Sequence, residues 1–232
     1  MLIFFILYLT VISSGILSSI IYLVQLRRST AKLPEAWRNS ASQKNFRNSI
    51  YLLTVFLVLT LINQLVLNYL IRNHINNGLS FSICFTVVPI PLFAFSYMHT
   101  QSRWKRYSYI VLHATLIGYL IIGGYYHPLR SPDMTISLVL NSVFFLIALI
   151  HLTDLLIHPE TDHFKFKLKI SLIVLVFALM ASILSSIYWE DVASGHPLHF
   201  PFGLVLQNGN MLLFYSSFAV LFTQEILKLL RR

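Results

Sequence analysis

Imidazole and carboxylate side chains recur near the ends of three apolar stretches of this chain. His151, Asp154 and His158 are separated by three and four residues, which places them on one face of a helix. His113 and His99 lie in or beside the two preceding apolar stretches. Imidazole and carboxylate groups bind zinc and related metals, and histidine titrates near neutral pH. This stripe, together with His113, therefore defines a candidate metal site or proton relay at His113, His151, Asp154 and His158.

A simpler interpretation competes with this one, and we favour it. His158 directly precedes Pro159 and stands close to Glu160 and Asp162, a pattern typical of a helix end in headgroup solvent. Polar residues are expected at such a position without any bound metal. The sequence accordingly predicts no cofactor.

Amide side chains form a second set, at the opposite end of the apolar stretches. This set consists of Gln64, Asn68, Asn141, Gln207 and Asn210. The first two are four residues apart and the last two three apart, so each pair shares a helix face. A cluster of neutral donors and acceptors could bind a small polar or lipidic ligand. The alternative is hydrogen bonding between helices, which we expect more often than ligand binding.

Several kinds of chemistry lack their usual motifs. The chain contains no Gly-x-Ser-x-Gly sequence and no glycine-rich phosphate loop, and its last apolar stretch has no lysine for a retinal Schiff base. Its single cysteine, Cys84, excludes an intrachain disulfide. These features disfavour an enzyme.

The composition is that of an integral membrane protein. Of the 232 residues 56% are hydrophobic and 11% are charged, against about 25% charged in a soluble domain. A membrane-spanning helix needs about 20 predominantly apolar residues. Seven stretches meet this requirement, at roughly 2–26, 50–71, 79–98, 107–126, 134–157, 168–189 and 203–227. We therefore expect an all-α polytopic membrane protein in which residues 1–232 form one domain of seven transmembrane helices.

The basic residues predict how these helices are oriented. Fifteen of the 17 lysines and arginines fall in the residues 27–49, 99–106 and 158–169 and in the C-terminal tail, which are alternate loops. Lysine and arginine in short loops remain on the cytoplasmic side. The N-terminus is thus expected outside and the C-terminus in the cytoplasm, in a bacterial inner membrane. The net charge of +9 faces anionic membrane lipids, and no nucleic-acid partner is expected.

Two features of the apolar stretches bear on movement and packing. Pro89 and Pro91 fall inside the third stretch and predict a kink or a hinge there, because each proline removes a backbone donor. Gly15 and Ser19 in the first stretch are four residues apart and predict a face on which helix backbones approach closely.

The chain resembles the seven-helix membrane modules of bacterial sensor proteins, including versions without an output domain. The resemblance rests on the topology and on His158, Pro159 and Glu160 followed by Lys165, Lys167 and Lys169, on Trp189, and on the charged segment Gln224–Arg232. It implies a sensor or signalling protein that acts through its cytoplasmic loops and C-terminal helix on a separate cytoplasmic partner, with its ligand among the amides. The alternatives are a small-solute transporter, suggested by the paired prolines and the His/Asp stripe, and a non-catalytic scaffold subunit.

Overall fold

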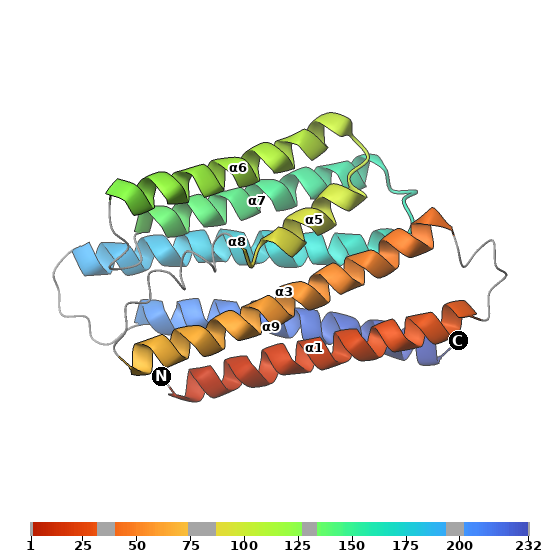
Figure 1. Cartoon of the computed structure of the whole chain (residues 1–232), viewed down its shortest axis with the longest axis horizontal. Coiled ribbons are helices and arrows are strands. Elements are labelled where there is room, and N and C mark those ends of the chain that lie inside the picture. Colours follow the sequence, from red (N-terminus) through yellow and green to blue (C-terminus); the bar gives the residue numbers. More distant parts are fainter. Residues whose placement is uncertain (1, 32–39, 74–86, 127–133, 194–201, 232) are drawn as a thin grey trace.

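The computed structural model describes residues 2–31, 40–73, 87–126, 134–193 and 202–231, and helices account for all the regular structure in these ranges (Figure 1). The helices are α1 (Leu2–Ala31), α3 (Ala41–Arg72), α5 (Ile90–His99), α6 (Arg103–Tyr126), α7 (Met134–Ile157), α8 (Phe164–Ala193) and α9 (Phe202–Leu230). The expected all-helical architecture is confirmed.

Five of these helices, α1, α3, α7, α8 and α9, are long and apolar enough to cross a membrane. Their apolar residues face outward as well as inward: Ile3, Leu17 and Leu213 are 74%, 61% and 70% exposed. Such side chains would be unfavourable in water but suit a lipid environment. The chain is thus a helical integral membrane protein. Seven crossings and their orientation remain predictions.

Most helices extend beyond the apolar stretches from which they were predicted. The helix α3 begins at Ala41 rather than near residue 50, because Ser40 caps it: the backbone N–H of Gln43 donates to Ser40 Oγ at 3.3 Å. Polar residues can continue a helix into solvent, but they contribute no apolar signal. Hydropathy alone therefore locates the apolar part of a helix better than its ends.

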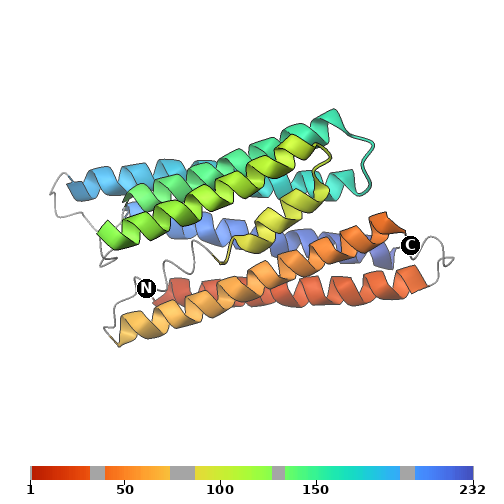
Figure 2. The same ribbon diagram turned by 45° about the horizontal axis from the view of Figure 1, so that its top comes forward.

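The helices form a ring in which each contacts its neighbours (Figures 1 and 2). The helix α1 packs against α3 and α9, and α8 packs against α7 and α9. The short α5 closes the ring, since it contacts α3 on one side and α6 and α7 on the other. It lies between these groups in both views, so it connects the two halves of the bundle.

The two prolines stand at the start of α5. Pro89 occupies the N-cap and Pro91 the first turn, where a missing N–H leaves no helical hydrogen bond unmade. In the described residues they therefore begin a helix of 10 residues and do not interrupt one. The first part of the expected span, residues 79–86, lies outside the described residues, and a hinge at the prolines stays a prediction.

Close packing at Gly15 agrees with the expected small-residue face. A Cβ atom added at Gly15 would lie 3.2 Å from Leu57 Cδ1 of α3 and 4.0 Å from Ala219 Cβ of α9. The missing side chain thus lets α1 approach two neighbouring helices. Ser19, one turn further along, is fully buried and accepts a hydrogen bond from Thr54 Oγ1 of α3 at 3.0 Å.

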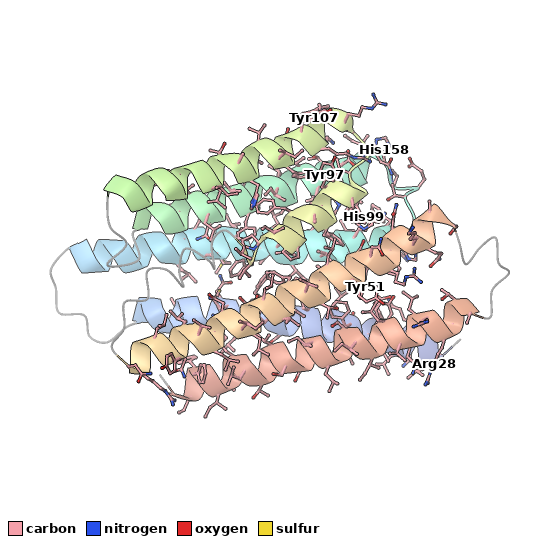
Figure 3. The ribbon with its side chains drawn as sticks, viewed as in Figure 1. Arg28, Tyr51, Tyr97, His99, Tyr107 and His158 are labelled. Atoms are coloured by element: carbon pink, nitrogen blue, oxygen red, sulfur yellow. The ribbon has the colours of Figure 1, made fainter. Side chains whose placement is uncertain are left out.

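The basic residues collect at one end of the bundle, where α1, α5, α7 and α9 end and α3, α6 and α8 begin (Figure 1). We call this the basic end. The described lysines and arginines there are Arg27, Arg28, Lys44, Arg47, Arg103, Lys105, Arg106, Lys165, Lys167, Lys169, Lys228 and Arg231. His99, His158 and Arg28 all lie toward this end (Figure 3).

Candidate functional site

A buried ion pair connects α6 to α7 at the basic end. Lys105 Nζ lies 3.1 Å from Asp154 Oδ1, and these side chains are 9% and 2% exposed. The other carboxylate oxygen, Oδ2, accepts the backbone N–H of Gln101 at 2.8 Å. One aspartate therefore compensates a buried ammonium and also fixes the turn between α5 and α6.

The same turn is held by its neighbour Thr100, which is fully buried. The hydroxyl groups of Thr100 and Tyr109 lie 3.0 Å apart, and the Thr100 carbonyl accepts Arg106 Nε at 2.7 Å. Tyr109 and Arg106 both belong to α6. The end of α5 is thus tied to α6 through backbone and side-chain bonds and to α7 through Asp154.

His151 lies one turn before Asp154 on α7, but its partner belongs to a different helix. Its Nδ1 lies 2.7 Å from Ser171 Oγ of α8, and Ser171 also donates to the Lys167 carbonyl at 3.0 Å. The ring is 1% exposed, and its Nε2 has no hydrogen-bond partner in the described residues. Beside it is a void of about 10 Å³, at the lower limit for a single water molecule.

His99, at the end of α5, connects this helix to α3. Its Nε2 contacts Ser49 Oγ, and the Ser49 hydroxyl donates to the Asn45 carbonyl at 2.7 Å. His99 and Ser49 are both buried. Together with the Asp154 contacts, this bond means that α5 is fixed to α3, α6 and α7 by polar groups at the basic end.

The four residues of the expected metal or proton-relay site do not converge on one point. His151 and Asp154 face α8 and α6 respectively, and His158 pairs with Glu160 through Nδ1 and Oε1 at 3.4 Å. His113 packs on the Phe93 ring with centroids 4.4 Å apart. No group of three or more metal-binding side chains occurs in the described residues. A metal or proton-relay role stays a prediction that this geometry does not favour.

An open cavity of about 440 Å³ lies beside this buried network at the basic end. Its walls come from the start of α3, the end of α5, the loop after α7 and the first turn of α8. Its polar lining includes Asn45, Gln101, Glu160, Thr161, Asp162 and Lys167. A volume of this size can admit a small ligand. We call it the basic-end cavity.

His163 shapes one wall of this cavity. Its backbone has a φ of 59°, in the left-handed region that non-glycine residues seldom adopt. Its ring stacks on Phe46 of α3, with centroids 3.6 Å apart and planes inclined by 4°. Burial lowers the pKa of His163, and the nearby Lys167 ammonium lowers this pKa further, while Asp162 and Glu225 oppose the change. The neutral ring is thus the favoured form in the folded protein.

The amides at the other end are only partly brought together. Asn141 of α7 and Asn210 of α9 are buried, and Asn210 Nδ2 donates to the Phe177 carbonyl of α8 at 3.3 Å. Gln64 and Asn68 of α3 are half-buried. The side chain of Gln207 lies outside the described residues. A shared pocket for the five amides stays a prediction, and the contact of Asn210 agrees with the helix-linking alternative.

From the sequence we did not expect Lys105 and Lys167 to be buried, because both lie in the expected loops 99–106 and 158–169, where side chains are normally exposed to solvent. Helical spacing carried the signal for each of them. Lys105 shares a face with Tyr109, four residues later, and Lys167 shares one with Ser171. Tyr109 and Ser171 are each 2% exposed. A lysine in register with a buried face is therefore a candidate for burial even at a helix end.

Comparisons with protein-family models, with curated proteins and with solved structures find no match to this chain. The class of protein thus rests on the fold and on the site. Both define a helical integral membrane protein with a buried polar network and a cavity at its basic end.

Proposed function

We propose that this protein is a membrane sensor or signalling subunit that acts on a separate cytoplasmic partner. The observation that supports this proposal is the continuity of α9. It runs as one helix from the end opposite the basic end, which we call the amide end because Asn141 and Asn210 lie toward it, to the basic end. A single helix of 29 residues can transmit a displacement over the whole thickness of a membrane.

Polar contacts hold α9 near both of its ends. At the amide end, the Tyr8 hydroxyl of α1 lies 2.9 Å from the Asn208 carbonyl and 2.8 Å from its Oδ1. At the basic end, Lys169 Nζ of α8 donates to Gln224 Oε1 at 3.0 Å. Between them, large apolar residues such as Phe218 and Phe222 are fully buried.

In the proposed mechanism, ligand contacts replace the hydrogen bond that Asn210 of α9 donates to the Phe177 carbonyl of α8. A small or lipidic ligand that binds Gln64, Asn68, Asn141, Gln207 and Asn210 would compete for the bond from Asn210 to Phe177. Loss of that bond would allow α9 to move relative to α8. A ligand shifts such an equilibrium only through its difference in affinity for the two states. The basic end, with Gln224 and Glu225, would then present a changed surface to the cytoplasmic partner.

Purification from native membranes tests the proposal. The protein would carry a C-terminal tag and be isolated in mild detergent, and quantitative mass spectrometry would measure what accompanies it. We expect one soluble protein in nearly equimolar amount, lost from the Gln224→Leu variant and retained by a control variant at Arg103, which is exposed on α6. Recovery of the protein without any such partner would contradict a signalling role.

A second candidate function is a small-solute transporter in the same membrane. It is supported by the basic-end cavity and by the buried Lys105–Asp154 pair near it. Intramembrane carboxylates commonly mark solute or proton pathways. This candidate predicts pH-dependent solute flux into liposomes that the Asp154→Asn variant loses. Flux that is the same in the variant and in the unaltered protein would contradict it.

A further inference from the structure

The basic-end cavity holds a buried lysine that forms no direct ion pair in the described residues. Lys167 is 6% exposed and lines the cavity, and its ammonium forms no hydrogen bond or ion pair with any residue that the structure describes. The other buried lysine, Lys105, has Asp154 at 3.1 Å. The exposed Asp162 carboxylate attracts this ammonium but does not pair with it directly. A buried ammonium without a direct partner is unfavourable, so an anion that enters the cavity would gain free energy at Lys167.

Neutral polar groups line the same cavity as Lys167. Thr161 Oγ1 is buried and has no partner in the described part of the chain. Asn45 and Gln101 line the same cavity and are exposed, so their side-chain amides are accessible to a ligand or to water. Hydroxyl and amide groups next to an ammonium suit the oxygens of a carboxylate or phosphate.

The rim of the cavity has the opposite charge. Glu160 and Asp162 line the cavity and both are exposed, and the Glu160 side chain is 73% exposed. Two carboxylates at the rim repel a simple anion but attract a cationic group. The cavity thus has a cationic buried part and an anionic rim, and a ligand that complements both must carry both charges.

We propose that the basic-end cavity binds a small zwitterion. Its carboxylate or phosphate lies at Lys167 with Thr161, Asn45 and Gln101, and its ammonium group lies toward Glu160 and Asp162. Free amino-acid-like molecules and the phosphoethanolamine headgroup of a lipid share this chemistry. The site is separate from the amides of the sensor proposal, and it stands or falls independently of that function.

Direct binding measurements on the full chain in detergent test the charge pattern. Isothermal titration would use four probes: phosphoethanolamine, glycine, ethanolamine and inorganic phosphate. We expect phosphoethanolamine or glycine to bind at least tenfold more tightly than ethanolamine and phosphate, which each satisfy only one part of the cavity. The proposal would be overturned if neither phosphoethanolamine nor glycine binds more tightly than phosphate, and also if no probe binds and no lipid is retained.

Two lysine variants locate the anionic group. The Lys167→Met variant should lose at least tenfold in affinity for phosphoethanolamine. The Lys165→Met variant is the matched control, because Lys165 is exposed on the same helix and its substitution removes the same charge. An equal loss in both variants would show that binding depends on net charge alone and would overturn the assignment.

The rim supplies a second test that changes no buried group. The double variant Glu160→Gln, Asp162→Asn should bind phosphoethanolamine no more tightly than phosphate, while its affinity for phosphate stays the same or rises. This test remains decisive if Lys167→Met fails to fold. Unchanged preference for phosphoethanolamine in the rim variant would contradict a role for these carboxylates.

Native mass spectrometry separates the two sources of the ligand. Samples would be prepared in nanodiscs containing phosphatidylethanolamine or only phosphatidylglycerol. Retention of phosphatidylethanolamine by the unaltered protein, and its loss from Lys167→Met, would assign the cavity to a lipid headgroup. Binding of free phosphoethanolamine in the phosphatidylglycerol discs, without retained lipid, would assign it to a soluble ligand.

Discussion

Asp154 and Lys105 form an ion pair of 3.1 Å between α7 and α6, with side chains 2% and 9% exposed. The same carboxylate accepts the Gln101 N–H at 2.8 Å. The pair thus joins two helices and also fixes the turn that places α5 against them. Its contribution lies in the position of α5, since the desolvation of two charges offsets much of their attraction.

Removal of one member of this pair should strongly destabilise the fold. The Asp154→Asn variant leaves the Lys105 ammonium buried without its counter-charge, which costs about 3–5 kcal/mol in comparable cases. We expect a lower midpoint of thermal unfolding in detergent, measured by intrinsic tryptophan fluorescence.

The double variant Lys105→Met, Asp154→Leu is the control for this prediction. It removes both charges and keeps similar volumes, so it should recover much of the lost stability. A double variant that is less stable than Asp154→Asn would mean that the hydrogen bond to Gln101, and not the charge balance, dominates the role of Asp154.

Substitution of Gly15 by a larger residue should destabilise the fold more than the same substitution of Gly118. An added Cβ at Gly15 would lie 3.2 Å from Leu57 Cδ1, and Leu57 is fully buried and therefore has little room to move. At Gly118 on α6 the same atom meets nothing within 4 Å. Overpacking costs about 1–3 kcal/mol, while alanine gains up to about 1 kcal/mol over glycine in a helix.

We therefore expect Gly15→Ala to lower the unfolding midpoint and Gly118→Ala to leave it unchanged or raise it. The larger, β-branched Gly15→Val should lower it further. Thermal unfolding of the three variants under one set of conditions checks the order. The same stability for both alanine variants would show that α1 can shift away from α3 without loss.

The sequence predicted the helices well because apolar stretches of about 20 residues define them directly. The bounds of α7, Met134–Ile157, agree with the expected range 134–157. The start of α3 was placed too late, since the cap at Ser40 and the polar turn after it contribute no hydropathy signal. The described lysines and arginines of the basic loops lie at one end of the bundle, which agrees with their expected placement in alternate loops, and the side of the membrane that this end faces stays a prediction.

The partners of the polar residues could not be predicted from spacing. His151 and Asp154 share a face of α7, but α7 lies between α6 and α8, so one side chain reaches Ser171 and the other reaches Lys105. That outcome depends on which helices neighbour α7, and spacing within α7 contains no such information. The same holds for Lys167, whose burial depends on the packing of α8 against the rest of the bundle.

Cysteine labelling should show that the basic end lies in the cytoplasm. In a Cys84→Ser background, Ser102→Cys places a thiol between α5 and α6, and Asn73→Cys places one after the opposite end of α3. We expect a membrane-impermeant maleimide to label Asn73→Cys in intact cells and Ser102→Cys only after permeabilisation. The reason is that short loops rich in lysine and arginine remain on the cytoplasmic side of the membrane. The reverse pattern would invert the assigned topology.

Acidification should weaken the fold through His163. Burial lowers the pKa of His163 in the folded protein, and the Lys167 ammonium lowers it further, although Asp162 and Glu225 act in the opposite direction. Above the unfolded-state pKa of about 6.5 both states are neutral and the stability is complete. As the pH falls below this value, the unfolded chain binds a proton that the folded chain resists, so stability decreases until the lower folded-state pKa is passed.

A variant at the same position isolates this contribution. His163→Asn removes the titrating ring, and asparagine tolerates the left-handed backbone at φ 59° better than most residues. We expect thermal unfolding midpoints between pH 7 and pH 5 to fall less steeply in this variant than in the unaltered protein, even if the loss of the stack on Phe46 lowers them throughout. Equal slopes would show that other groups carry the acid sensitivity, because a residue without a titrating ring cannot contribute to the proton uptake that sets the slope.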